Sequence, residues 1–407
     1  MINLKGRWLT DKWWVSYLNF LDEVRKSFRL PKKVVIHDIT LRDGEQQAGV
    51  VFNKEDKIKI ATMLDEVGVS RIEAGMPAVS KEDKEAVKAI AHLGLNADVF
   101  CFARCMKRDV DLALECDVGG VEMEIPSSEH LIKYAYDWPL EKAVELPIEA
   151  TTYAADHGLY VAFFTIDATR ADLDWWFKII DKVATEGHMD SLVLVDTFGV
   201  CTPEAIRYFT RKARERFNKP IEAHFHNDFG LAVANTLAAV TEGVEIIHTT
   251  VNGMGERMGN ADLAEVALAL EALYGLELGL KYNKLYELSR LVENLSGVKM
   301  PPHKPVVGEG AFKVESGIVA GWWTNLEGKN PLIMFPYRWD FVGQNGVEII
   351  LGKKSGKDSI IRKLREVGID TSHADLDKIL EEVKEESIKR KASIPNEILK
   401  QIIKNKK

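Results

Sequence analysis

Apolar and polar positions alternate in regular blocks along this chain from about residue 34 to residue 280. Short apolar runs such as 34–39 are typical of buried strands, and segments with apolar residues at helical spacing follow them, as at 54–67 and 82–93. Asn53 and Ser80 stand where helix N-caps belong, and Gly68 and Gly94 stand where helices end. The remaining predicted strands cover residues 71–75, 98–103, 120–126, 160–167, 191–197, 222–227 and 246–252.

Eight strand–helix units over roughly 240 residues predict an α/β fold, a (β/α)8 TIM barrel. A doubly wound open sheet is the alternative, but it would not normally need eight evenly spaced units. We expect an N-terminal helical extension over 1–33, the barrel over 34–280, and a linker with mostly helical subdomains over 281–407. The proline-rich stretch at 301–305 and the highly charged residues after 355 suggest the last boundary.

The N-terminal extension is rich in apolar side chains. From Trp13 onward their spacing suits an amphipathic helix, which we expect to pack on the barrel or on a partner subunit rather than on a membrane. The apolar residues are Trp8, Trp13, Trp14, Tyr17, Leu18, Phe20, Leu21 and Val24.

Composition limits the classes of function. The 407 residues are 46% hydrophobic and 29% charged, typical of a soluble protein with a sizeable core. The net charge of −8 argues against nonspecific nucleic-acid binding, since no overall positive field would neutralise phosphates. No apolar run approaches a membrane span, the N-terminus lacks signal-peptide features, and the four cysteines have neither zinc spacing nor a disulfide framework. These features predict a cytoplasmic protein with reduced thiols.

The candidate chemistry lies at predicted strand ends. Arg42 and Asp43 follow the first strand, and His224 and His226, two residues apart, project to the same side of the seventh. Two imidazoles and a carboxylate suit Zn, Mn, Co, Fe or Mg. The set also suits a non-haem iron oxygenase, but the barrel and the arginine favour Lewis-acid chemistry. Asn260 follows the eighth strand and can offer a carbonyl oxygen to the metal. In the same loop we expect Glu256 and Arg257 to form an ion pair.

Together these residues resemble the metal-dependent barrel enzymes of the 2-isopropylmalate, homocitrate and citramalate synthase group, which includes 3-hydroxy-3-methylglutaryl-CoA lyase. The resemblance covers about residues 34–360, and its later part, around 301–309, 315–318 and 354–356, is similar to the synthases alone. Four motifs occur in order: Thr40-Leu41-Arg42-Asp43-Gly44-Glu45-Gln46, Asp196-Thr197-x-Gly199, His224-x-His226-Asn227-Asp228 and Asn252-Gly253-x-Gly255-Glu256-Arg257-x-Gly259-Asn260.

The resemblance implies roles for these residues. Asp43, His224 and His226 would hold a divalent metal (Zn, Mn, Co or Mg), with Asn260 near it. A 2-oxo acid would chelate that metal, Thr197 and Gln46 would bind the substrate, and Arg42 would stabilise the developing oxyanion. Acetyl-CoA would be the second substrate, and we expect a homodimer.

Two positions depart from the synthase pattern. The synthases carry an acid–base His where this chain has Val319, and a Glu where it has Ile166. The lyase's cysteine in the strand-eight loop is also absent. Substitutes with ionisable side chains are His37, His303, Glu122, Glu124 and Asp167, none of which is singled out by spacing.

Another position bears on the substrate. The homocitrate synthases carry a strand-five arginine for a second carboxylate, and Ala162 takes that place here, so 2-oxoglutarate is not the expected substrate. The apolar segment 75–79 would suit an aliphatic side chain.

Three hypotheses follow. The first is an acyltransferase that condenses acetyl-CoA with a 2-oxo acid. The second is a metal-dependent aldolase, lyase or decarboxylase of a 2-oxo or 2-hydroxy acid, because cleavage can generate an enolate without the usual base. The third is a noncatalytic homologue, which the retained Arg42, Asp43, His224, His226 and Asn260 argue against.

Overall fold

The computed structural model describes residues 6–326, 328–369 and 375–404. The first five residues of the predicted N-terminal extension and the last three of the C-terminal region lie outside this set. Contacts within the chain divide it into two compact units, residues 17–300 and residues 1–16 with 301–407. This division differs from the predicted boundaries at residues 33 and 280.

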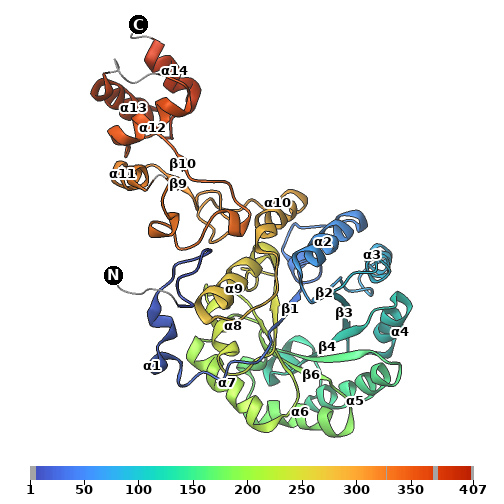
Figure 1. The fold of residues 1–407 in the computed structure, drawn as a ribbon. Coiled ribbons are helices and arrows are strands. Elements are labelled where there is room, and N and C mark those ends of the chain that lie inside the picture. Colours follow the sequence, from blue (N-terminus) through green and yellow to red (C-terminus); the bar gives the residue numbers. More distant parts are fainter. Residues whose placement is uncertain (1–5, 327, 370–374, 405–407) are drawn as a thin grey trace. The chain divides into compact units, whose positions relative to one another are not determined.

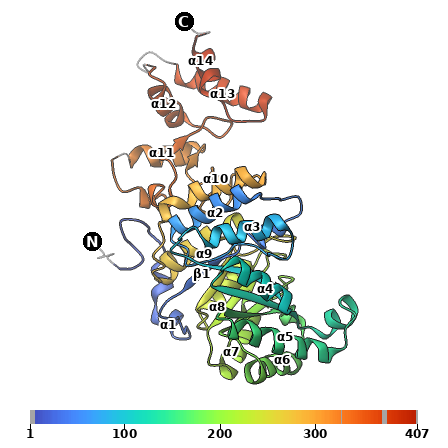
Figure 2. The ribbon, with the colours of Figure 1, turned by 90° about the vertical axis from the view of Figure 1, so that its right-hand side faces the viewer.

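The larger unit is a closed barrel of eight parallel strands in sequential order, as the sequence predicts (Figures 1 and 2). The first and last strands pair in register, with His37 opposite His248. The strands are β1 Val35–Asp38, β2 Arg71–Glu73, β3 Asp98–Arg104, β4 Gly120–Pro126, β5 Tyr160–Ile166, β6 Ser191–Asp196, β7 Ile221–Phe225 and β8 Ile246–Thr249.

Helices surround the strands on the outside of the barrel (Figure 1). The predicted caps are confirmed for the first two: the Asn53 side chain accepts from the Asp56 N–H, and Ser80 accepts from the Asp83 N–H. Gly68 ends the first helix with a φ of 99°, which only glycine adopts easily. The helices are α2 Lys54–Val67, α3 Lys81–Ala91, α4 Lys107–Cys116, α5 Leu140–Asp156, α6 Leu173–Glu186, α7 Pro203–Arg216, α8 Ala232–Val240, α9 Leu263–Ala269 and α10 Leu285–Ser296.

The predicted N-terminal amphipathic helix is wrong. Only the 3-10 helix η1 (Tyr17–Phe20) and the one-turn α1 (Asp22–Arg25) form there. Before them the Thr10 hydroxyl accepts from the Lys12 and Trp13 N–H groups, a local bond that competes with a helix.

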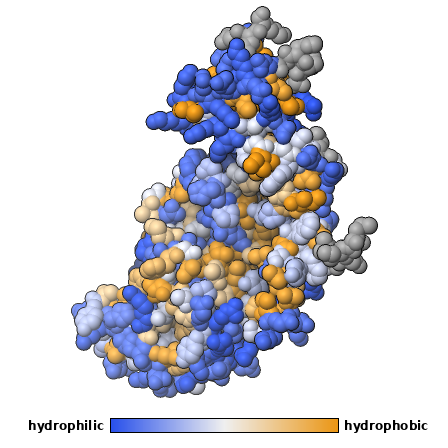
Figure 3. Space-filling model, turned by 90° about the vertical axis from the view of Figure 1, so that its left-hand side faces the viewer, coloured by the Kyte–Doolittle hydropathy of each residue, from blue (hydrophilic) through white to orange (hydrophobic). Residues whose placement is uncertain are grey.

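Apolar side chains of this segment remain exposed. Tyr17, Leu18, Leu21 and Val24 are among the exposed large hydrophobic residues. Figure 3 shows the side of the molecule that carries α1, with apolar side chains in orange between polar ones in blue. The predicted burial of the stripe on the barrel is therefore not found for these four residues.

The smaller unit has its own cores. Its described residues form two short parallel strands, β9 Lys313–Val314 and β10 Glu348–Ile349, and four α-helices, α11 Gly317–Asn325, α12 Lys357–Glu366, α13 Leu376–Arg390 and α14 Asn396–Lys404. Leu351, Ile360, Leu364, Val383 and Leu399 form its main apolar cluster. No helix among the described residues of either unit is long and apolar enough to cross a membrane.

Candidate metal centre

The predicted metal residues meet at the carboxyl-terminal end of the barrel, where such barrels carry their active sites. Asp43 lies in the turn after β1, His224 on β7, and His226 one residue beyond β7, where it bridges to Asn260. All four side chains are buried. The strand that was predicted to include His226 ends at Phe225, yet the two imidazoles still face one another.

Three side-chain atoms lie close enough together to bind one metal ion. The Nε2 atoms of His224 and His226 are 3.2 Å apart, and they lie 3.5 and 3.7 Å from Oδ2 of Asp43. Ligands about 2.1 Å from one ion lie roughly 3.0–3.4 Å from each other in octahedral or tetrahedral geometry. Asp43, His224 and His226 can therefore hold one divalent ion with little movement.

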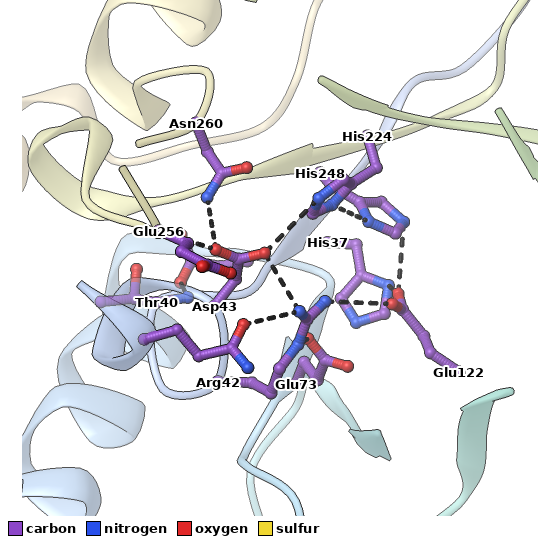
Figure 4. A network of polar contacts seen from close by, with 12 residues as sticks. His37, Thr40, Arg42, Asp43, Glu73, Glu122, His224, His248, Glu256 and Asn260 are labelled. Carbon is purple, nitrogen blue, oxygen red and sulfur yellow. Dashed lines mark hydrogen bonds and ion pairs between the residues drawn. The ribbon is translucent and has the colours of Figure 1, made fainter. Parts of the chain in front are cut away.

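Asn260 supports this arrangement from the loop after β8. Its Nδ2 donates to Oδ1 of Asp43 over 3.0 Å, while its buried Oδ1 has no hydrogen-bond partner (Figure 4). An unpartnered buried carbonyl oxygen beside three ligand atoms fits a bound cation. The backbone N–H of Glu256 also donates to Asp43, over 3.3 Å. The expected Glu256–Arg257 ion pair is wrong, because Arg257 pairs with Asp228 at 2.9 Å, across the neighbouring loop.

Arg42 is fixed on several sides. Its Nε donates to Glu73 over 2.6 Å, its Nη1 donates to Asp43 over 3.0 Å, and its guanidinium carbon lies 4.1 Å from the Phe102 ring centre. Burial raises the pKa of Glu73 to about 7, against the opposing effect of Arg42. Sequence reasoning missed Glu73, which ends the short strand β2 and is fully buried.

The protonation states suit metal binding. Burial lowers the pKa of His224 well below its usual value, so the imidazole is neutral and has a lone pair. Burial opposes ionisation of Asp43, but His226 and Arg42 hold its pKa below the usual value. Both are the forms in which these side chains bind metals.

The two predicted substrate-binding residues lie at the same end of the barrel. Thr197 follows β6 and is half-buried, and its Oγ1 accepts from the Asp167 N–H over 2.7 Å, which leaves the hydroxyl hydrogen available. Gln46 is exposed, and its Oε1 lies 3.5 Å from Nη1 of Arg42.

A second ionisable cluster lies deeper in the barrel, and sequence reasoning did not assemble it. It contains His37, Glu122, Glu222 and His248 from β1, β4, β7 and β8, all buried. Burial lowers the pKa of His37 to about 3. The sequence did contain one clue to this cluster, which is the alternation of side chains along a strand. Glu222 precedes His224 by two residues, so both side chains face the inside of the barrel.

The five candidate substitutes for the missing acid–base groups have different surroundings. His37 and Glu122 belong to the deeper cluster, and His303 belongs to the smaller unit. Asp167 forms ion pairs with Arg170 at 2.7 Å and His130 at 3.0 Å. Glu124, two residues after Glu122 on β4, is half-buried. Burial raises its pKa to about 6, with Arg42 and Arg104 opposing.

Known proteins are similar to this chain in sequence and in fold. A family model described as HMGL-like matches residues 33–292. Homocitrate synthase AksA of Methanopyrus kandleri is 43% identical over 95% of this chain and 96% of that protein. The (R)-citramalate synthase CimA of Methanocaldococcus jannaschii is 43% identical over 86% of this chain and 70% of that protein. A probable 2-isopropylmalate synthase of Methanopyrus kandleri is 45% identical over 88% of this chain and 70% of that protein.

Solved structures agree on the fold. The HMG-CoA lyase of Bacillus subtilis superposes with a TM-score of 0.61 at 21% identity, over 67% of this chain and 96% of that one. The chain matches the family model over more than half its length and the AksA synthase over nearly all of it. It therefore belongs to the HMGL-like family of enzymes, in the group that contains the homocitrate, 2-isopropylmalate and citramalate synthases.

Proposed function

We propose that this protein is a divalent-metal-dependent acyltransferase that condenses acetyl-CoA with a 2-oxo acid. The observation that carries the proposal is the convergence of Asp43, His224 and His226 beside Arg42 at the carboxyl end of the barrel. The similarity to named synthases over nearly the whole chain supports the acyltransferase reaction over other metal chemistry.

The residues around the site have distinct tasks. A divalent ion held by Asp43, His224 and His226 would polarise the keto group of the 2-oxo acid. Arg42, fixed by Glu73, donates hydrogen bonds where negative charge develops on the keto oxygen. The Thr197 hydroxyl binds the substrate carboxylate, and Gln46 helps to hold the substrate from the rim of the barrel.

Carbon–carbon bond formation needs a base, and we assign that role to Glu124. Its side chain is half-buried, lies on the same inner face of β4 as Glu122, and is close enough to Arg42 for the guanidinium to oppose the rise in its pKa. It takes a proton from the methyl group of acetyl-CoA, and the resulting carbanion attacks the keto carbon. The alkoxide is protonated, and water then cleaves the thioester, which releases CoA and a 2-hydroxy dicarboxylic acid.

The substrate side chain is aliphatic in this proposal. Apolar residues line the barrel beside Arg42: Phe102, Ala162, Phe164, Val193 and Val195, with Met76 and Ile166 packed against them. Fully buried Ala162 offers no positive charge to a second carboxylate. These observations favour a small aliphatic 2-oxo acid over 2-oxoglutarate, although homocitrate synthases are among the relatives.

The test is a thiol-release assay with acetyl-CoA, Mn²⁺ or Zn²⁺, and a panel of pyruvate, 3-methyl-2-oxobutanoate and 2-oxoglutarate. We expect CoA release that depends on the metal and on an aliphatic member of the panel. The Asp43→Asn variant should lose this activity, whereas Asp98→Asn, at the exposed start of β3, should keep it. If no 2-oxo acid releases CoA from the metal-loaded wild type, the synthase proposal is wrong.

A second candidate is a metal-dependent aldolase, lyase or decarboxylase. Val319 and Ile166, in place of the synthases' ionisable residues, favour it, since neither side chain can transfer a proton. It predicts release of a 2-oxo acid from 2-hydroxy acid substrates without acetyl-CoA. The homodimer and the cytoplasmic location stay predictions.

A further inference from the structure

The deeper cluster has the geometry of a second metal centre. Nδ1 of His37 and Nε2 of His248 each lie 3.3 Å from Oε1 of Glu122. The same two nitrogens lie 3.7 and 2.8 Å from Oε2 of Glu222. One ligand atom from each of the four residues lies within 4.8 Å of every other. The four printed separations, 2.8 to 3.7 Å, are close to those of the Asp43 cluster and to the distances between ligands of one ion.

Two members of this cluster, His37 and Glu122, have polar atoms without a hydrogen-bond partner. Both ring nitrogens of His37 and both carboxylate oxygens of Glu122 are buried without a hydrogen bond, and both residues are fully inaccessible to solvent. A buried carboxylate or imidazole without a partner is costly, so native proteins rarely keep one. Oε2 of Glu122 has one charged neighbour, Nη2 of Arg42 at 3.6 Å. A cation beside Oε1 of Glu122 would compensate that oxygen and the nearby nitrogen of His37.

Neighbouring side chains orient Glu222 toward the same point. Its Oε1 accepts from Ser191 over 2.5 Å and from Arg71 over 3.1 Å, so Oε2 alone faces the two imidazoles. Arg71 is itself held between the rings of Phe100 and Tyr160, at 4.8 and 4.5 Å. Such second partners fix the orientation of metal-binding side chains in known centres.

We propose that His37, Glu122, Glu222 and His248 bind a second divalent cation inside the barrel. Two imidazoles and two carboxylates form a mixed nitrogen and oxygen set that suits Zn²⁺, Co²⁺, Mn²⁺ or Fe²⁺. The two carboxylates neutralise the charge of the ion, which makes the centre tolerable in a buried volume. We call this the inner site, and the Asp43 cluster the outer site.

One contact links the two sites. Nδ1 of His224 and Nδ1 of His248 lie 3.3 Å apart, and the tautomers decide which ring donates. When Nε2 of His248 binds the inner ion, Nδ1 of His248 carries the hydrogen. If Nε2 of His248 instead carried a hydrogen and donated it to Glu222, the cluster would support His224 without binding an ion. That arrangement is the alternative outcome of the test.

The metal content of the full chain distinguishes an inner site that binds an ion from a hydrogen-bonded cluster that does not. In the Asp43→Ala variant the outer site is removed, so purified protein equilibrated with Zn²⁺ should retain about one equivalent by mass spectrometry. Co²⁺ in its place should give visible ligand-field absorption. Adding Glu122→Gln should abolish both signals, whereas adding Glu124→Gln, the same substitution two residues along β4, should leave them.

A loss of metal at the inner site can be told apart from misfolding of a variant and from failure of the proposed acyltransferase function. Circular dichroism checks the fold of each variant, and His37→Gln provides a second disruption of the inner site if Glu122→Gln unfolds. An Asp43→Ala protein that is folded yet binds no Zn²⁺ or Co²⁺ would overturn the inner site. A loss of acyltransferase activity alone would not, since metal content is measured without substrate.

Discussion

Arg42 donates from Nε to a carboxylate oxygen of Glu73 over 2.6 Å, and neither side chain is open to solvent. This pair links the turn after β1 to the end of β2 and keeps the guanidinium beside Asp43. The orientation of the proposed oxyanion donor is thus set before any substrate binds, which is how such donors are most effective.

The first prediction concerns Arg42→Lys. Lysine keeps the charge but not the planar fork, so it cannot donate to Glu73 and Asp43 and lie over Phe102 at once. We expect kcat to fall about 10²-fold or more, because the lost donor acts on developing charge. Steady-state kinetics measures this, with the exposed Arg104→Lys as a control. An unchanged kcat would contradict the role of Arg42.

The second prediction concerns Gly255→Ala. A Cβ at Gly255 would lie 2.1 Å from Nδ2 of Asn260 and 2.9 Å from Oδ1 of Asp43. The alanine would displace both side chains, and we expect metal affinity at the outer site to fall about 10- to 100-fold, as for other supporting residues.

The matched control is Gly49→Ala. Gly49 also has a positive φ, of 90°, but nothing lies within 4 Å of a Cβ placed there. It therefore reproduces the backbone strain without the crowding. Calorimetric titration with Mn²⁺ would compare the two variants, and equal affinities would contradict the proposed contact.

The third prediction concerns Glu124→Gln. The amide keeps the size of the side chain but cannot accept a proton, and removing a general base lowers the rate by about 10²–10⁴-fold. We also expect the wild-type enzyme to transfer deuterium from D2O into the methyl group of acetyl-CoA, and the variant to lose this exchange. Glu115→Gln, on the exposed side of α4, serves as the control. Undiminished exchange would assign the base to another residue.

The fourth prediction concerns Cys201, the one cysteine of the described chain that is not buried. Burial of its sulfur and the nearby Asp196 raise the pKa of the thiol to about 11. Because only the thiolate reacts, alkylation should be slow at pH 8 and rise about tenfold per pH unit up to pH 10. Mass spectrometry of iodoacetamide-treated protein follows this, and Cys201→Ser should remove the signal. A rate that levels off below pH 9 would contradict the raised pKa.

The sequence predicted the barrel and the outer cluster because both have local signatures. Each strand–helix unit is visible in its own stretch, and Arg42-Asp43 and His224-x-His226 each lie within a few residues. The site residues that were missed depend on contacts across the barrel. Glu73 gains its role only from Arg42, and His37 meets His248 only because β1 pairs with β8.

The prediction of an N-terminal helix also failed because of contacts between distant parts of the chain. The spacing of its apolar residues matches a helix, but Trp13 pairs with Tyr337, which lies far along the chain. Its indole N–H also donates to the Arg7 carbonyl over 3.0 Å. Long-range pairing of this kind overrides a local periodic pattern. The pairing cannot be predicted from the first 33 residues, because the partner residue lies far along the chain.

The register between His37 on β1 and His248 on β8 has a consequence for biosynthesis. The first strand leaves the ribosome early, but its partner on one side is the last strand of the barrel, so the wall cannot close until residue 249 has emerged. Until then the ionisable side chains of the interior are open to water. Burial, which lowers the pKa of His37 and raises that of Glu122, therefore acts on these groups only once the last strand has paired with the first.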